Sequence, residues 1–357
     1  MLPYFILVGV PAFLSMLQLW KKDEKRHMRV IDSFFLILLG LLLVRKETMG
    51  IDLYNYSKMF RTAIHTPLDK IISYIVTFEH ESGFYFLAKI VSIFSTDFRV
   101  MLSAITLISV IPLWMLYREC SVSHPFLSIA VFLNIGVFSI YFSCLRQVIA
   151  MAFLLPAYHY TQQKHPIRFL LTVILAFLFH KSAFIMLFLY PAFHMKIKTK
   201  ASFILALPVW GVCYVFRKPL FTFFRSFISD FYTSNLKETG AIAILLLLLM
   251  LTFFSYLVTD ERKMTPETVG LRNILVFSAI LQIFAGVNPL AMRLNYYYLI
   301  FIPLIIPKIA ECASEKNKTL TQVILVVMVC FFTSYYFYDA YTDVSTLRIY
   351  PYIPFWE

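Results

Sequence analysis

Long apolar runs alternate with short polar or basic segments along most of this chain. The first two runs cover residues 2–20 and 30–44, and comparable runs, among them 201–216 and 241–258, return up to residue 334. Such runs predict membrane-spanning helices, because about 20 helical residues are needed to cross the hydrocarbon core. The pattern predicts an all-α, polytopic transmembrane helical bundle of about 12 helices, some of them short or re-entrant.

The composition places the whole chain in the membrane class. Of its 357 residues, 60% are hydrophobic, 18% aromatic and only 15% charged, which excludes an ordinary soluble domain. We therefore expect a single integral membrane domain over residues 1–357. The formal net charge of +12 comes from short connections between apolar runs and does not indicate nucleic-acid binding. The five cysteines lack the paired spacing of a zinc or redox site.

Basic segments orient the bundle. Residues 21–29, 162–168 and 196–200 are assigned to the cytoplasm, because short basic loops stay on that side, and the N-terminus then lies outside. Residues 45–83 carry five basic and five acidic side chains and are too polar to span. We interpret them as an extracytoplasmic loop with interfacial helices.

The run 169–193 lies between two segments assigned to the cytoplasm, so it must form a hairpin of two short arms with His180 at its tip. Residues 260–272 are interpreted as a cytoplasmic connection, and residues 288–293 as a tight outside turn. With these assignments Arg45, Arg146, His180 and Arg293 all lie on the extracytoplasmic side.

Between Gly83 and Arg118 the number of apolar segments does not match the number of membrane crossings that the orientation requires. Two apolar segments, 84–94 and 100–117, stand where an odd number of crossings is needed. Either the shorter segment is re-entrant or interfacial, or the local orientation is reversed.

Arginines inside or beside apolar runs are the main candidates for chemistry. A charge held at membrane depth costs about 2.5 kcal/mol or more, so something normally compensates Arg146. Together with Arg45, Arg293 and His180 it suggests a site for an anion with several charged oxygens, such as a pyrophosphate. The alternatives are an interhelical ion pair for Arg146 and headgroup anchoring for Arg45 and Arg293.

His180 suits a proton carrier, a donor to an anion, or a satisfied turn residue. Asp52 and Glu81 suit a base for a sugar hydroxyl or a hydrogen-bonding partner of several hydroxyls; the alternatives are a helix cap or a partner for Arg45. Nearby tyrosines suit stacking on sugar faces. No second histidine or carboxylate stands at metal-ligand spacing from His180, so we expect no metal and no cofactor.

In order and spacing these residues resemble the EpsG-type branch of the Wzy-like polysaccharide polymerases. The resemblance rests on Arg45 with Gly50-x-Asp52-x-x-x-Tyr56, on Glu81-x-Gly83, on Arg146-Gln147-x-x-Ala150, on His180-Lys181-Ser182, and on Arg293 with Tyr296-Tyr297. The chain departs from the usual pattern at Ile51 and at Cys144-Leu145.

The resemblance implies a glycosyltransferase of bacterial exopolysaccharide, capsule or O-antigen synthesis. It would join oligosaccharide repeat units carried on undecaprenyl pyrophosphate, in the cytoplasmic (inner) membrane with its site facing outward. A GT-C-like architecture is compatible with it, and membrane lipids, a chain-length regulator and a flippase are the implied partners.

The resemblance also divides the site residues into two groups. The implied catalytic residues are Arg146, His180, Arg293, Asp52 and Glu81. The implied substrate-binding residues are Arg45, Tyr56, Gln147, Lys181, Tyr296 and Tyr297. The arginines would hold the leaving pyrophosphate in place of a metal ion.

Two other functions also fit an outward-facing polar site. A flippase or transporter for lipid-linked oligosaccharide would line a cavity with arginines, although the internal repeats typical of transporters are not evident. A membrane O-acyltransferase would use His180 but would not need several arginines. A serine protease is disfavoured, because no Gly-x-Ser-x-Gly element occurs.

Overall fold

The computed structural model describes residues 2–18, 27–79, 81–120, 124–225, 242–342 and 349–357, and its regular structure in these ranges is helical. The first helices are α1 (Leu2–Gln18), α2 (His27–Val44), α3 (Leu53–His65), α4 (Leu68–Val76), α5 (Ser82–Ser92), α6 (Phe98–Glu119), α7 (Pro125–Asn134), α8 (Val137–Ser143), α9 (Leu145–Ala152) and α10 (Leu154–Gln162). The rest are α11 (Pro166–Phe179), η2 (Lys181–Phe188), α12 (Leu189–His194), α13 (Lys200–Val215), α14 (Arg217–Arg225), α15 (Ile242–Val258), η4 (Glu261–Lys263), α16 (Pro266–Ala285), α17 (Pro289–Leu299), α18 (Ile302–Glu311), η5 (Glu315–Asn317) and α19 (Lys318–Thr342). The all-α prediction is confirmed.

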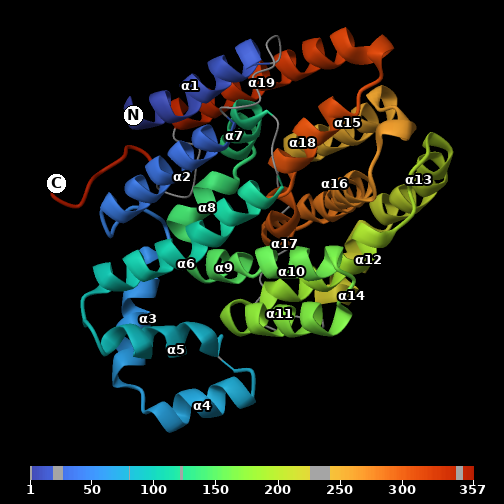
Figure 1. The fold of residues 1–357 in the computed structure, drawn as a ribbon. Helices are drawn as coiled ribbons and strands as arrows, with labels where there is room; N and C mark the ends of the chain where they lie inside the picture. Colours follow the sequence, from blue (N-terminus) through green and yellow to red (C-terminus); the bar gives the residue numbers. More distant parts are fainter. Residues whose placement is uncertain (1, 19–26, 80, 121–123, 226–241, 343–348) are drawn as a thin grey trace.

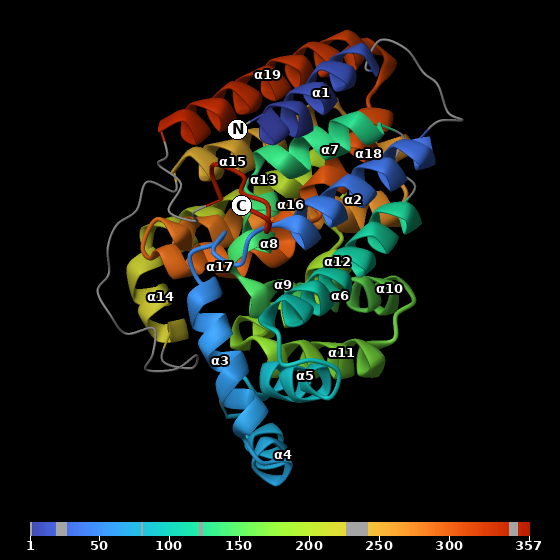
Figure 2. The same cartoon turned by 90° about the vertical axis from the view of Figure 1, so that its left-hand side faces the viewer.

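Helices α3, α4 and α5 project from the remaining helices as an arm, which points downward in both ribbon views (Figures 1 and 2). The arm rejoins the rest through α5, which packs on α6 and α11. We call the remaining helices the body. In the body, α1 lies along α19 and α7, and α16 packs between α15 and α17.

Buried polar side chains tie the central helices of the body together. Asn295 on α17 donates through Nδ2 to Gln282 Oε1 at 2.8 Å and accepts a hydrogen bond from the Ser278 hydroxyl at 2.8 Å. All three residues are fully buried. Such interhelical hydrogen bonds hold helices together where apolar contact alone gives little preference for a partner.

Helix lengths bear out the membrane class but not the predicted number of spans. In the part of the chain that is described, α6, α16 and the segment containing α19 are long and apolar enough to cross a membrane. The count rises to five if the bent pairs α7–α8 and α13–α14 are each one span. The predicted total of about 12 helices spanning or entering the membrane is not confirmed by this measure, because the chain breaks several apolar runs into short pieces.

Several predicted segments form where the apolar runs indicated. The first two runs became α1 and α2, and the runs near 201–216 and 241–258 became α13 and α15. The run 169–193 breaks at His180, as expected for a hairpin. Helix α5 has 11 residues, about 16 Å of helix, too short to cross a bilayer. This length favours a re-entrant or interfacial α5.

Two predictions about the C-terminal half were wrong. The tight turn expected at 288–293 is instead the start of α17, with Arg293 inside the helix. The connection expected up to Arg272 is shorter, because α16 already begins at Pro266. Thr265 caps that helix by accepting a hydrogen bond from the Thr268 amide, and proline suits the first turn.

The extra turns of α16 bury Arg272 completely. Its guanidinium lies 3.8 Å from the centre of the Tyr256 ring and donates to the Lys198 carbonyl oxygen at 2.5 Å. This arginine therefore fastens the segment between α12 and α13 to the bundle.

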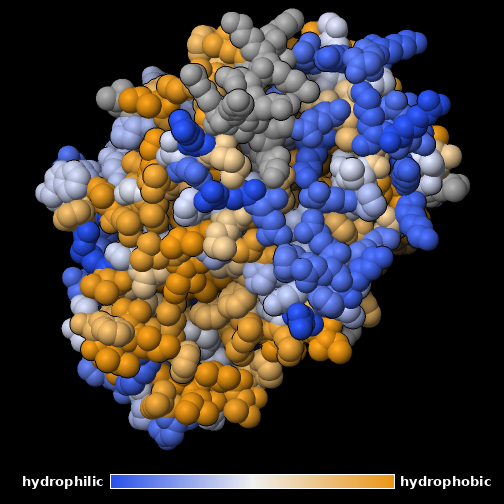
Figure 3. Space-filling model, viewed as in Figure 1, coloured by the Kyte–Doolittle hydropathy of each residue, from blue (hydrophilic) through white to orange (hydrophobic). Residues whose placement is uncertain are grey.

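Hydrophobic side chains cover much of the arm. In Figure 3 they gather over the lower left of the molecule, where α3–α5 lie in Figure 1, and hydrophilic ones gather at the upper right. On α4 the exposed residues Leu68, Ile72 and Val76 recur every four positions and form one stripe. The helices expected within 45–83 are present, and an apolar stripe suits a membrane interface.

Gly50 joins the arm to the body, and we predict that Gly50→Ala destabilises the protein. Its φ of +125° is unfavourable for any other residue, and an added Cβ would meet the Phe142 carbonyl oxygen directly. We expect a loss of about 1–3 kcal/mol in the free energy of unfolding, measured by thermal unfolding in detergent.

Gly40→Ala is the matched control, because nothing lies within 4 Å of the added Cβ and alanine favours helix. Equal effects of the two substitutions would contradict the prediction.

Candidate functional site

Glu81, Arg146 and His180 meet where the arm joins the body. One carboxylate oxygen of Glu81 pairs with Arg146 Nη1, and the other lies 2.6 Å from His180 Nδ1. The second oxygen also accepts a hydrogen bond from the Lys181 amide at 3.1 Å. We call these three side chains the Glu81 cluster.

The backbone around Glu81 is shaped for this contact. Glu81 has φ of +50° and ψ of +57°, a left-handed conformation that is unfavourable for a non-glycine residue and is often retained at functional sites. Two residues later, Gly83 is buried, and a Cβ there would lie about 3.0 Å from the Leu178 backbone. Glycine thus lets the start of α5 approach the end of α11, which brings Glu81 to His180.

His180 lies at a break in the chain. Helix α11 ends at Phe179, His180 is extended, and the chain continues as the 3-10 helix η2. The break places the His180 ring and the Lys181 amide on the same carboxylate. The side chain of His180 is only 5% exposed, so its contact with Glu81 is shielded from water.

Arg146 follows a second break, at Cys144, between α8 and α9. Its guanidinium lies 5.5 Å from the centre of the Tyr56 ring and hydrogen-bonds the Tyr56 hydroxyl. Burial raises the pKa of that hydroxyl to about 12, so it remains neutral at ordinary pH. The close approach of Gly50 to Phe142, together with an Ile51 amide that donates to the Ser143 hydroxyl at 3.3 Å, fixes the start of α3 here.

Arg293 approaches the same region from α17. The side-chain amide of Gln147 donates to the Arg293 carbonyl oxygen at 2.5 Å and so ties α9 to α17. Cys144 lies close enough to Arg146, Arg293 and Asp52 to interact with all three charges. In the sequence, Cys144 stands out only as a departure from the family pattern, and nothing in its spacing indicated this position.

The remaining candidates take different places around the cluster. Tyr296 is near Arg293 and Cys144, whereas Tyr297 is fully buried and shares a hydrogen bond with Ser182 at 3.2 Å. Asp52 stands at the N-cap position of α3, but its carboxylate does not cap the helix and makes no hydrogen bond or ion pair with the residues that the structure describes.

Arg45 lies apart from the Glu81 cluster. It is 2% exposed, donates to the Tyr141 carbonyl oxygen at 2.7 Å and stacks on Phe142. Its backbone pairs with Pro354 in an isolated bridge. The structure therefore places Arg45 between α8 and the C-terminal segment and does not bring it into the cluster.

The charges of the cluster hold Glu81 ionised. Burial alone would raise the pKa of the Glu81 carboxyl, but the hydrogen bond and charge of His180, then the charge of Arg146, lower it to about 2. A carboxylate with so low a pKa is a poor base near neutral pH. Glu81 is thus better suited to orient His180 and Arg146 than to accept a proton.

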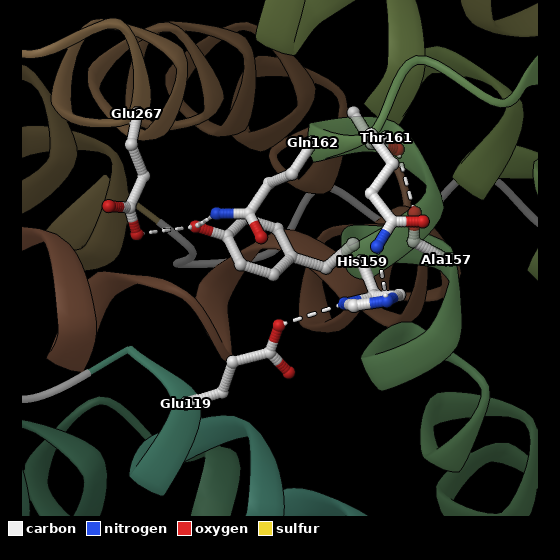
Figure 4. A network of polar contacts seen from close by, with 8 residues as sticks. Glu119, Ala157, His159, Thr161, Gln162 and Glu267 are labelled. Atoms are coloured by element: carbon white, nitrogen blue, oxygen red, sulfur yellow. Dashed lines mark hydrogen bonds and ion pairs between the residues drawn. The ribbon is translucent and has the colours of Figure 1, made fainter.

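A second polar network lies near the C-terminal end of α6, opposite the end that is next to the arm (Figure 4). The Glu119 carboxylate contacts His159 at 3.0 Å, and the Tyr158 hydroxyl donates to Glu267 at 3.0 Å. Lys308 pairs with Glu267 at 2.8 Å. With 22 residues, α6 separates this end from the arm by about 33 Å.

Metal ligands are not grouped at either place. Within the described ranges, no three His, Cys, Asp or Glu residues lie close enough together to hold a metal ion.

The sequence model of the EpsG family matches residues 29–353 of this chain. The match includes every residue of the Glu81 cluster together with Arg293. No curated protein and no solved structure matches the chain. The chain belongs to the EpsG family, the family of Wzy-like polysaccharide polymerases, and the predicted family is confirmed.

We predict that Glu81→Gln destabilises the protein in a pH-dependent way. Because the pKa of Glu81 is lowered from 4.5 to about 2 in the folded state, its stabilising effect is complete above about pH 4.5 and disappears as the pH falls to about 2. At pH 7 we expect Glu81→Gln to lower the free energy of unfolding by about 3 kcal/mol.

Thermal unfolding in detergent across this pH range measures the difference. Glu79→Gln is the matched control, because Glu79 is exposed and forms no ion pair among the described residues. A gap between Glu81→Gln and wild type that does not change with pH would contradict the prediction.

Proposed function

We propose that this protein is a polysaccharide polymerase that joins oligosaccharide repeat units carried on undecaprenyl pyrophosphate. The observation that carries the proposal is the Glu81 cluster, which brings Arg146 and His180 together next to Arg293 in an EpsG family member. Two arginines from different helices suit a pyrophosphate, since each guanidinium can bind phosphate oxygens in a bidentate fork.

The proposed location is the outer face of the bacterial inner membrane, in a bundle of about 12 helices that span or enter the bilayer, some re-entrant, with a GT-C-like arrangement. The distribution of charge supports this orientation. Arg118 and Lys308 lie at the second polar network, about 33 Å along α6 from the arm, and basic residues favour the cytoplasmic side. We further propose a flippase and a chain-length regulator as working partners.

In the proposed reaction, the bond between the sugar anomeric carbon and the pyrophosphate oxygen of the donor breaks. The pyrophosphate leaves with the bonding electron pair, and an acceptor hydroxyl forms the new glycosidic bond. Arg146 and Arg293 stabilise the charge that develops on the leaving group, which is commonly the largest single contribution to catalysis. An arginine has five N–H donors, so pairing of Nη1 with Glu81 is compatible with donation to phosphate.

The acceptor hydroxyl must lose a proton, and we assign that proton to His180. With Nδ1–H donating to Glu81, the imidazole Nε2 carries the lone pair that accepts it. Glu81 is then a positioning residue. Asp52 is the second candidate for the base. Its carboxylate lies near Cys144 and forms no hydrogen bond or ion pair with the described residues.

The other candidates take supporting roles in this proposal. Gln147 positions Arg293, Tyr297 positions η2 through Ser182, and Tyr56 and Tyr296 contact the sugars or phosphates together with Lys181. Arg45 acts from a distance by fixing α8.

We predict that Arg146→Ala and Arg293→Ala each reduce polymerisation by about 100-fold or more, because each removes donors to the leaving group. Arg146→Lys keeps the positive charge but cannot bind two phosphate oxygens in the bidentate geometry. We expect its polymerisation to lie between that of Arg146→Ala and that of wild type. The measurement is the length distribution of surface polysaccharide in a deletion strain complemented at matched protein levels.

Arg61→Ala is the matched control for this experiment, since Arg61 is an exposed arginine of the arm outside the cluster. Single repeat units at the surface without long chains support the proposal. Unchanged chain length would refute it, and lipid-linked units retained on the cytoplasmic side would identify a flippase.

We also predict that polymerisation does not depend on a metal ion, because the arginines supply the positive charge at the leaving group. Purified enzyme with lipid-linked repeat units should keep its rate in EDTA. Loss of activity in EDTA that returns with magnesium would overturn this prediction.

A further inference from the structure

A groove of about 710 Å³ lies between α1 and α2 and has α7 as its floor. Its walls are apolar, with Ile6 and Val10 on α1 and Ile37 on α2, and Phe126 and Ile129 close the bottom. Figure 2 shows α7 between α1 and α2, and both of these helices pack on α7. Its volume lies within the range of about 300–1,000 Å³ that is usual for small-ligand sites.

One end of this groove is cationic. Arg29, in the first turn of α2, lines it together with Ser33 one turn later, and both residues are exposed. The acid nearest in sequence on that helix, Asp32, is engaged elsewhere, since it accepts a hydrogen bond from Trp114 at 2.7 Å and pairs with Arg118 at 3.7 Å. Within the described ranges Arg29 forms no ion pair, so its guanidinium and the Ser33 hydroxyl are available to a phosphate diester.

The dimensions of the groove fit one leaflet of a bilayer. From Arg29 to Leu41, the lining residues on α2 cover 12 helical steps, about 18 Å, and half of the hydrocarbon core is about 15 Å. An acyl chain that starts at a phosphate held by Arg29 would thus end near the middle of the membrane or slightly beyond it.

The cationic end is remote from the Glu81 cluster. Arg45, which follows the far end of α2, contacts α8, the helix that leads to Arg146. From Arg29 to Val44 the helix rises by about 22 Å, which is most of the hydrocarbon core of about 30 Å. A phosphate at Arg29 therefore belongs to the leaflet opposite the Glu81 cluster, which excludes the pyrophosphate of a substrate bound there.

We propose that this groove is a binding site for one anionic phospholipid of that opposite leaflet, with the headgroup phosphate on Arg29 and Ser33 and an acyl chain between α1 and α2. The site is independent of the proposed polymerase reaction. The bound lipid contacts both α1 and α2, whose facing surfaces are otherwise separated by the groove, and so fixes their relative position.

The test uses the purified, delipidated full-length protein in detergent, titrated with phosphatidylglycerol or with phosphatidylcholine of the same acyl chains. Native mass spectrometry counts the bound lipid. We expect one phosphatidylglycerol to bind at least about fivefold more tightly than phosphatidylcholine, and Arg29→Ala to remove this preference. Arg29→Lys should retain most of it, and Val10→Trp should weaken binding of both lipids by filling the groove.

Arg262→Ala is the matched control, because Arg262 is an exposed arginine outside the groove. Equal binding of the two lipids by wild type, or an equal effect of Arg262→Ala and Arg29→Ala, would overturn the proposal. Displacement of phosphatidylglycerol by an equimolar amount of undecaprenyl phosphate would also overturn it, since the groove would then be a carrier site. Thermal unfolding without lipid verifies that each variant is folded.

Discussion

A carboxylate buried among helices remains ionised only where positive groups face it, and Glu81 meets this condition with both of its oxygens. Arg146 occupies one oxygen, and His180 and the Lys181 amide occupy the other. These contacts join α5, α9 and the end of α11, which come from the arm and from two separate breaks in the body. The interaction therefore determines both the local fold and the spacing of the groups that we assign to catalysis.

Periodicity and composition were sufficient to predict the all-helical membrane class and several helices. The break at His180 was also predictable, since the hairpin followed from the basic segments on both sides of it. The start of α16 was missed although Thr265 and Pro266 are ordinary signals for a helix start. The charge of Arg272 led to its assignment to a connection, whereas the ring of Tyr256 and two backbone carbonyl oxygens compensate that charge inside the bundle.

The candidate site was predictable as a set of residues but not as an arrangement. Sequence order brought Glu81, Arg146, His180 and Arg293 to attention, but it also placed Arg45 in the same site, as a substrate-binding residue. Burial and partners separate the two arginines: Arg45 donates to a backbone carbonyl oxygen of α8, and Arg146 pairs with a carboxylate. The contact of Gly83 with the Leu178 backbone is a tertiary packing requirement, which no local pattern encodes.

The arm contributes Glu81 to a cluster whose other two members belong to the body. A displacement of the arm would withdraw the carboxylate and leave Arg146 and His180 without the group that orients them. The state of the site is thus linked to the position of three helices whose exposed stripe on α4 suits a membrane surface. A change in bilayer thickness or tension that moved this stripe would also move Glu81 relative to Arg146 and His180.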